Sequence, residues 1–134
     1  MKLQKEPEYS HGSLANIGIL LVNLGTPEAP TKRAVKEYLA EFLWDPRVVE
    51  ISRPIWWLIL NGIILRTRPK ASAKKYATIW SDQGSPLRIY TEKQADLLQS
   101  TFNGDTFAKI IVKSAMSYGK PSVDGELSKL RAEG

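Results

Sequence analysis

The sequence predicts an α/β fold built on a parallel sheet, and three observations support this class. Residues 17–24 form an almost continuous apolar run, which ends at the turn residues 25–27. A short apolar run closed in this way is typical of a strand buried on both faces of a parallel sheet. A second strand is predicted within 107–117, and the chain between the two strands has the apolar spacing of helices. Helices that separate strands favour an α/β arrangement.

Capping and turn residues predict where the helices lie. Thr31 is suited to cap a first helix, which ends before Asp45-Pro46 because a residue followed by proline disfavours helical geometry. Thr91 has capping-box spacing to Gln94 and predicts the start of a later helix. The predicted helices cover about 31–44, 72–80 and 91–102. A last helix is predicted after Gly119, Pro121 and Ser122, which break the chain and cap the helix, and Gly134 is expected to end it.

Residues 54–65 (PIWWLILNGIIL) form the most apolar stretch of the chain, and basic residues flank it. The stretch is too short to span a bilayer, which needs about 20 residues. Two interpretations remain open: a helix buried in the protein, or an interfacial segment. In the second case Trp56 and Trp57 would lie at the level of lipid headgroups, and the flanking arginines would contact anionic lipid.

Length and strand number predict one incomplete domain. Residues 1–16 are expected to form a flexible tail, and residues 17–134 an α/β domain. Two strands cannot cover the apolar faces of so many helices, and parallel sheets usually contain more strands. We therefore expect a partial, three-layer parallel-sheet domain that is truncated within the sheet.

Composition excludes several kinds of site. The chain has no cysteine and a single histidine, His11, so it cannot build disulfides, thiolate metal sites, multi-histidine metal sites or a histidine-based dyad. Phosphate-binding glycine motifs and the nucleophile elbow are also absent from the sequence. No metal site is predicted in this chain.

The net charge of +5 predicts an anionic partner or surface. Five cations cluster within ten residues, and they are Arg66, Arg68, Lys70, Lys74 and Lys75. No nucleic-acid-binding motif accompanies them, so nucleic acid is not expected as a partner. The first residues lack the apolar segment of a signal peptide, which favours a cytoplasmic location.

Five segments in a fixed order carry a family resemblance: LLVNLGTP at 20–27, RPKASAKKYATIW at 68–80, GSPL at 84–87, IYTEKQADLL at 89–98 and AMSYGKPS at 115–122. Together they resemble the N-terminal part of bacterial ferrochelatase, over about residues 17–134. The resemblance implies a chelatase-like fold in which porphyrin lies in a cleft between two α/β domains. It also implies insertion of ferrous iron into protoporphyrin IX to form protohaem, the last step of haem biosynthesis. Iron is then a substrate, and no cofactor is expected in this chain.

The resemblance also implies what this chain lacks. The family's facing histidine and glutamate, which remove protons and deliver the metal, belong to the C-terminal part of the enzyme. No catalytic residue is therefore expected here, and the chain alone is expected to be inactive. Two alternatives remain: a non-catalytic porphyrin- or haem-binding module, and a membrane-surface module.

The resemblance assigns candidate roles to residues of this chain. Leu24 matches the position that faces the porphyrin centre, but a leucine cannot ligate iron. Ser117 stands where many members have arginine, so no anion-binding role is assigned to it. Residues expected to contact porphyrin or its propionates are Leu24, Gly25, Thr26, Pro27, Lys75, Tyr76, Ser85 and Tyr118. A hydrophobic lip that could place the enzyme at the periphery of the inner membrane comprises Trp56, Trp57, Leu58, Leu60, Ile63 and Ile64.

Overall fold

The computed structural model describes Gly12, residues 15–104 and residues 108–133. Predictions about His11 and most of the tail, the strand start at Phe107, and Gly134 lie outside these residues. The elements, in chain order, are β1 (Ala15–Gly25), α1 (Lys32–Trp44), α2 (Arg53–Ile59), the π-helix η1 (Leu60–Ile64), α3 (Leu65–Ile79), α4 (Pro86–Thr101), β2 (Ala108–Tyr118) and α5 (Val123–Ala132). The predicted α/β class is confirmed.

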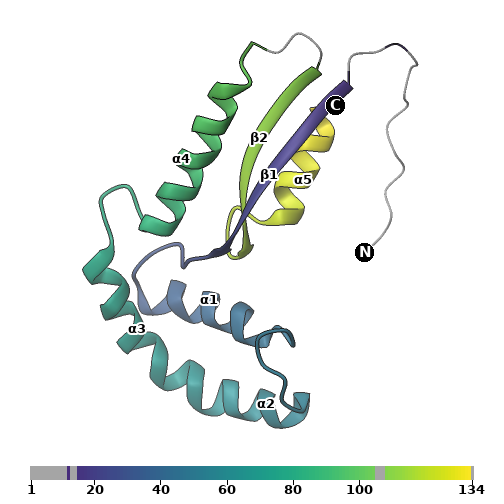
Figure 1. The fold of residues 1–134 in the computed structure, drawn as a ribbon. Helices are drawn as coiled ribbons and strands as arrows, with labels where there is room; N and C mark the ends of the chain where they lie inside the picture. The colour runs from purple at the N-terminus through teal and green to yellow at the C-terminus, as the bar shows by residue number, and fades with distance from the viewer. Residues whose placement is uncertain (1–11, 13–14, 105–107, 134) are drawn as a thin grey trace.

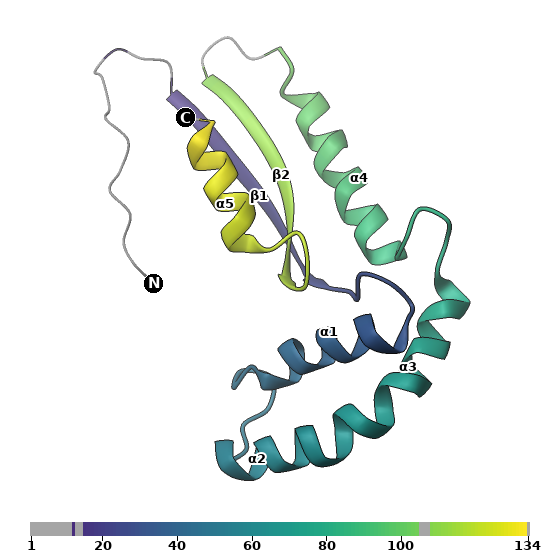
Figure 2. The same cartoon turned by 180° about the vertical axis from the view of Figure 1, so that it is seen from behind.

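The strands β1 and β2 pair in parallel, with Gly18 opposite Ile111. Helices α4 and α5 lie on opposite faces of this pair, as the two views in Figures 1 and 2 show. Thr91 of α4 bonds to Asn23, whereas Leu130 of α5 lies against Gly18. Positions 18 and 23 are an odd number of residues apart and therefore face opposite sides of the sheet. The arrangement is a small helix–sheet–helix sandwich.

Strand β1 differs from the prediction because it is not buried on both faces. Ile17, Val22 and Leu24 are 46%, 52% and 51% exposed. Among the described residues only β2 pairs with β1, and the layer helices lie mainly over β2. Burial of β1 on both faces, which its apolar sequence predicted, is therefore not found among the described residues.

The predicted caps of the first and last helices are confirmed. The Thr31 hydroxyl accepts the backbone N–H of Ala34 at 3.3 Å, and Ser122 accepts the N–H of Gly125 at 3.2 Å. Helix α1 lies beyond the carboxyl ends of both strands, next to α2 and α3 (Figure 1). The molecule therefore has a sheet part and a helical part that meet at the strand ends.

The chain stays helical from Arg53 to Ile79 through α2, η1 and α3. The helix predicted over 72–80 therefore begins earlier, at Leu65. Trp56, Leu60 and Leu65 are buried in one cluster that packs against α1. The Trp56 Nε1–H donates to the carbonyl of Leu43 at 2.7 Å. One face of the apolar stretch is thus a buried helix, as the first interpretation requires.

Helix α4 begins at Pro86, so the capping box predicted at Thr91 and Gln94 is wrong. Ser85 occupies the N-cap, and Pro86 stands at the first helical position, where its missing N–H costs nothing. Thr91 lies inside the helix, and its hydroxyl donates to the carbonyl of Leu87 at 2.7 Å. The Ser-Pro pair therefore defines the start of the helix.

Candidate functional site

The turn after β1 is buried and locked to the start of α4. Gly25, Thr26 and Pro27 are all buried. The Thr26 hydroxyl donates to the Ser85 hydroxyl at 2.9 Å, with the two residues 4% and 3% exposed. These two predicted site residues come together from distant segments, and their hydroxyls bond to each other. This hydrogen bond fixes the turn against the start of α4.

Gly25 is required by the sheet. Its φ is +118°, a conformation that residues with a side chain rarely adopt. A Cβ at this position would lie 2.0 Å from the carbonyl oxygen of Tyr118. The backbone of Gly25 therefore approaches β2 closely, in a way that a residue with a side chain could not.

Three aromatic rings connect the turn to α1. The Tyr38 hydroxyl donates to the carbonyl of Gly25 at 3.2 Å. Its ring stacks on Phe42 at 5.9 Å between centroids, and Phe42 meets the edge of Tyr118 at 5.1 Å. Burial raises the pKa of Tyr38 to about 12, so its hydroxyl stays a donor at neutral pH. No motif in the sequence indicated that Tyr38 holds the turn.

The predicted site residue Tyr118 is buried and points at α1. Its hydroxyl donates to Asp45 Oδ2 at 2.9 Å. Arg47 bonds to the same carboxylate, with Nε 3.0 Å from Oδ1, and holds the pKa of Asp45 well below its usual range. The carboxylate is therefore ionised and links the end of β2 to the end of α1.

Leu24, at the end of β1, is 51% exposed. Its own N–H donates to Asn23 Oδ1 at 2.8 Å, and Asn23 Nδ2 donates to Thr91 Oγ1 at 3.0 Å. The amide side chain of Asn23 thus joins the strand end to α4 and fixes the backbone of Leu24. An outward apolar side chain on a fixed backbone, at the carboxyl end of a parallel strand, is well placed for ligand contact.

Lys75 and Tyr76 lie on α3, and Tyr76 is near enough to Tyr38 to contribute to the raised pKa of that residue. They line an open hollow of about 250 Å³ with Ser72 and Ile79. Lys75 is exposed, whereas Tyr76 is half-buried, and burial raises the pKa of Tyr76. The tyrosine ring packs edge-on against Trp80, with 6.3 Å between the ring centroids. The hollow therefore presents the exposed ammonium of Lys75 beside an aromatic ring.

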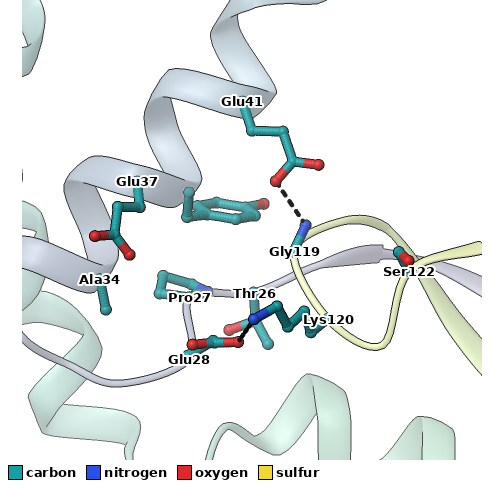
Figure 3. Close-up of a pocket in the computed structure, with 10 residues that line it drawn as sticks. Thr26, Pro27, Glu28, Ala34, Glu37, Glu41, Gly119, Lys120 and Ser122 are labelled. Carbon is teal, nitrogen blue, oxygen red and sulfur yellow. Dashed lines mark hydrogen bonds and ion pairs between the residues drawn. The ribbon is translucent and has the colours of Figure 1, made fainter. Parts of the chain in front are cut away.

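A second hollow, of about 330 Å³, opens between α1 and the loops that follow both strands (Figure 3). Glu28, Glu37 and Glu41 contribute carboxylates to its wall, and Lys120 pairs with Glu28 at 3.4 Å. Glu41 accepts the N–H of Gly119 at 3.0 Å. The excess of negative charge opposes binding of an anion, so this hollow does not suit the carboxylates of a porphyrin.

The predicted lip divides into two sets. Trp57, Leu58 and Ile63 are 53%, 64% and 60% exposed. Trp56 and Leu60 are buried, at 6% and 2%, so the prediction that they belong to an exposed lip is wrong. The sequence could not separate the sets, because nearly every position of the stretch is apolar and only packing against α1 selects the inner face. Ile64 is partly buried against the same cluster.

Neither a metal centre nor a membrane span is found in the described part of the chain. No three His, Cys, Asp or Glu side chains gather there closely enough to hold a metal ion. None of the helices described there combines the length and hydrophobicity needed to cross a membrane.

Comparison with known proteins agrees with the resemblance seen in the sequence. The family model described as Ferrochelatase matches residues 16–134. The ferrochelatase of Herminiimonas arsenicoxydans is 58% identical over 134 residues, which is 100% of this chain and 36% of the relative. That of Aromatoleum aromaticum is 57% identical over 129 residues, 96% of this chain and 35% of the relative. That of Polaromonas sp. is 54% identical over 138 residues, 100% of this chain and 37% of the relative.

The chain thus spans only 35% to 37% of the length of these relatives. The range matched by the family model includes the locked turn, the Ser-Pro start of α4 and the end of β2. A match over nearly the whole chain at this level of identity shows that the chain belongs to the ferrochelatase family.

Proposed function

We propose that this chain forms one wall of the porphyrin cleft of a ferrochelatase, which inserts ferrous iron into protoporphyrin IX. The observation that carries the proposal is the exposed Leu24 at the end of β1, whose backbone N–H is held by Asn23. Three separate contacts fix its surroundings: Thr26 to Ser85, Tyr38 to Gly25 and Asn23 to Thr91. Because these contacts already hold the backbone, binding of a flat macrocycle against Leu24 needs no further ordering of the turn.

In this proposal Leu24 contributes shape and no chemistry. Its side chain has no donor atom, so it does not hold iron on the path into the macrocycle. Contact with a bent porphyrin fits the idea that binding energy is used to distort the substrate. We assign proton removal and metal delivery to groups that the rest of the enzyme supplies.

The exposed ammonium of Lys75 is proposed to receive a porphyrin propionate. It is a point charge that does not require a fixed hydrogen-bonding geometry, and Tyr76 beside it offers an apolar ring surface. Thr26 and Ser85 are not proposed as direct contacts, because their hydroxyls are buried against each other. Substitution of Lys75 by Gln should weaken porphyrin binding more at low than at high salt.

A titration of porphyrin absorbance with the 134-residue chain tests the cleft wall. Replacing Leu24 by Asp should weaken protoporphyrin IX binding about tenfold or more, because burial of a leucine is worth about 1.5–3 kcal/mol. Leu127 is exposed to a similar extent, at 49%, and lies on α5, so Leu127→Asp is the matched control. Equal affinities of the two variants would refute the role of Leu24. A chain that binds no porphyrin at all would favour a membrane-surface module.

A metallation assay tests whether catalysis needs groups that the rest of the enzyme supplies. The 134-residue chain, given protoporphyrin IX and ferrous iron, should produce no more protohaem than a protein-free control. Porphyrin binding without turnover agrees both with an enzyme part and with a non-catalytic porphyrin-binding module. Joining the chain to the remaining length of a relative should restore turnover only in the first case. Robust turnover by the chain alone would overturn the proposal that other groups are needed.

The exposed lip residues carry a second proposal: peripheral contact with the cytoplasmic face of the inner membrane. Trp57, Leu58 and Ile63 present an apolar surface, and Arg66 follows it within one helical turn. Apolar residues beside cations are the composition of an interfacial segment. Trp57→Ser should reduce co-sedimentation with anionic liposomes, whereas Ile79→Ser, at a position 57% exposed on the far end of α3, should not. Equal co-sedimentation of both variants would contradict the membrane role.

A further inference from the structure

Another hollow lies in the helical part of the molecule, where α1 and the continuous helix of α2, η1 and α3 lie side by side (Figures 1 and 2). Its volume is about 220 Å³, and apart from one amide its wall is made of apolar and aromatic side chains. The residues that line it are Ala40, Trp44, Trp57, Leu60, Asn61 and Leu65. An apolar cavity of about 150 Å³ already holds a molecule the size of benzene, so this hollow has room for a short stretch of hydrocarbon.

The spacing of the buried residues explains one wall of this hollow. From Trp56 to Ala73, buried positions follow one another every four residues, except for a five-residue step from Leu60 to Leu65. The π-helix η1 lies at this step, and the N–H of Leu65 donates to the carbonyl of Leu60. The wider turn keeps both leucines on the side of α1, where Ala40 packs against their cluster. Because alanine is short, the space beside this contact stays open.

Two exposed tryptophans flank the hollow. Trp44 and Trp57 are 42% and 53% exposed, although both line it. The guanidinium of Arg53 lies over the ring of Trp44, 3.8 Å from its centroid, and Nη2 donates to the Trp44 carbonyl. The other terminal nitrogen, Nη1, has no hydrogen-bond partner within the described residues. A cation with an unused donor therefore lies one ring away from an apolar space.

The segment that forms most of the hollow carries the positive charge of the chain. Residues 51–81 contain six basic and no acidic residues, whereas the net charge of the whole chain is +5. The six are Arg53, Arg66, Arg68, Lys70, Lys74 and Lys75. No ion pair within the described residues involves them, whereas Arg33, Arg47 and Arg88 each pair with a carboxylate. This segment therefore complements a negatively charged partner.

We infer that the hollow binds the acyl chain of an anionic phospholipid, with the phosphate of that lipid at Arg53. A phospholipid joins hydrocarbon to a negative charge, and this site joins an apolar wall to cations that no described carboxylate neutralises. The exposed Leu58 and Ile63 extend the apolar surface beyond the hollow. An acidic peptide or a nucleic acid would match the cations but not the apolar wall. The inference deepens the proposed membrane contact and rests on it, because a bilayer is the source of the lipid.

A phospholipid kept below its micelle concentration tests the hollow without a bilayer. The probes are dihexanoyl phosphatidylglycerol, which is anionic, and dihexanoyl phosphatidylcholine, which is zwitterionic. In an NMR titration of the 134-residue chain, phosphatidylglycerol should shift the amide signals of Ala40 and Asn61 in a saturable way. It should bind about tenfold more tightly than phosphatidylcholine, because a hydrogen bond to a charged group is added. The absence of saturable binding, or equal affinities of the two lipids, would overturn the inference.

Filling the hollow tests its place as the site of the acyl chain. Ala40→Phe puts a ring into it and should weaken phosphatidylglycerol binding about tenfold or more. Ala77→Phe adds the same ring at an exposed position of α3 and is the matched control, which should bind as the parent does. Trp57→Ala removes one wall at an exposed position, so it gives the answer if Ala40→Phe does not fold. It should weaken binding about fivefold, whereas Ile79→Ala should not. Equal effects of the site variants and their controls would refute the site.

A charge variant tests the position of the phosphate. Arg53→Gln should remove the preference for phosphatidylglycerol over phosphatidylcholine, because it removes the cation beside the hollow. Arg33→Gln changes an exposed arginine of α1 that is paired with Glu37, and this control should keep the preference. A preference that survives in Arg53→Gln would overturn the placement of the phosphate.

The same titration in a longer protein separates the remaining outcomes. In a chimera, this chain replaces the matching segment of the Herminiimonas arsenicoxydans ferrochelatase, and binding should persist. Loss of binding there would mean that the rest of the polypeptide covers the hollow, and displacement of the lipid by protoporphyrin IX would mean that porphyrin occupies it. Either result would overturn the inference. Co-sedimentation with anionic liposomes without binding of the monomeric lipid would refute the hollow and leave the membrane contact standing. Binding of the monomeric lipid without co-sedimentation would refute the membrane contact alone.

Discussion

The hydroxyl pair of Thr26 and Ser85 gives the sharpest test of how the turn is held. Thr26→Val keeps the shape of the side chain and removes the donor. The Ser85 hydroxyl is then left buried at 3% exposure without its partner. An unpaired buried hydroxyl costs about 1–3 kcal/mol, so the free energy of unfolding should fall by that amount. Ser85→Ala should cost a similar amount, because it orphans the Thr26 hydroxyl.

The double variant separates this pairing from other effects. Once both hydroxyls are gone, no polar group is left unpaired, so the double variant should lose less than the sum of the single losses. We expect a coupling of about 1–2 kcal/mol between the two positions. Urea unfolding followed by tryptophan fluorescence measures all four proteins, and the urea dependence should be the same in each.

A matched pair of exposed hydroxyls provides the control. Thr78 lies on α3 and Ser128 on α5, and both are exposed. The costs of Thr78→Val and Ser128→Ala should therefore add within about 0.5 kcal/mol. If Thr26→Val and Ser85→Ala are equally additive, the two hydroxyls do not depend on each other, and the turn is held in some other way.

Three further predictions concern the turn, the aromatic rings and the lip. Gly25→Ala should lower the free energy of unfolding by more than about 2 kcal/mol, because the added Cβ meets the Tyr118 carbonyl at 2.0 Å in a strained conformation; a loss below 1 kcal/mol by urea unfolding would contradict this. The pKa of Tyr38 rises from 10.0 to about 12 on folding, so its contribution is full below pH 10 and is lost as the pH rises toward 12, by up to about 2–3 kcal/mol. In Tyr38→Phe the free energy of unfolding should therefore fall less steeply as the pH rises from 10 to 12. An unchanged slope of this free energy against pH would argue against the raised pKa. Trp56→Ser should cost about 3–5 kcal/mol and Trp57→Ser less than about 1 kcal/mol, because only Trp56 is buried; thermal unfolding that ranks them the other way would refute this assignment.

The sequence predicted the elements whose signals are local. The apolar run of β1, the Thr31 cap and the Ser122 cap each depend on residues within a few positions of one another, and all three are found in the structure. The start of α4 was misplaced because the Thr91 pattern competes with the Ser-Pro pair, and the pair prevails. The family was also identified from the sequence, because five motif segments occur in a fixed order along the chain.

What the sequence determined by itself is the family, the α/β class and the stretch that ends at Leu24, because motif order and apolar spacing are properties of the chain alone. Only the tertiary structure decided the rest, since each answer depends on a contact between distant segments. It showed that Gly25 is required by Tyr118, that Thr26 and Ser85 face each other, and that Leu24 remains exposed. Burial is set by what packs against a side chain, and an apolar sequence cannot state which of its faces will be covered.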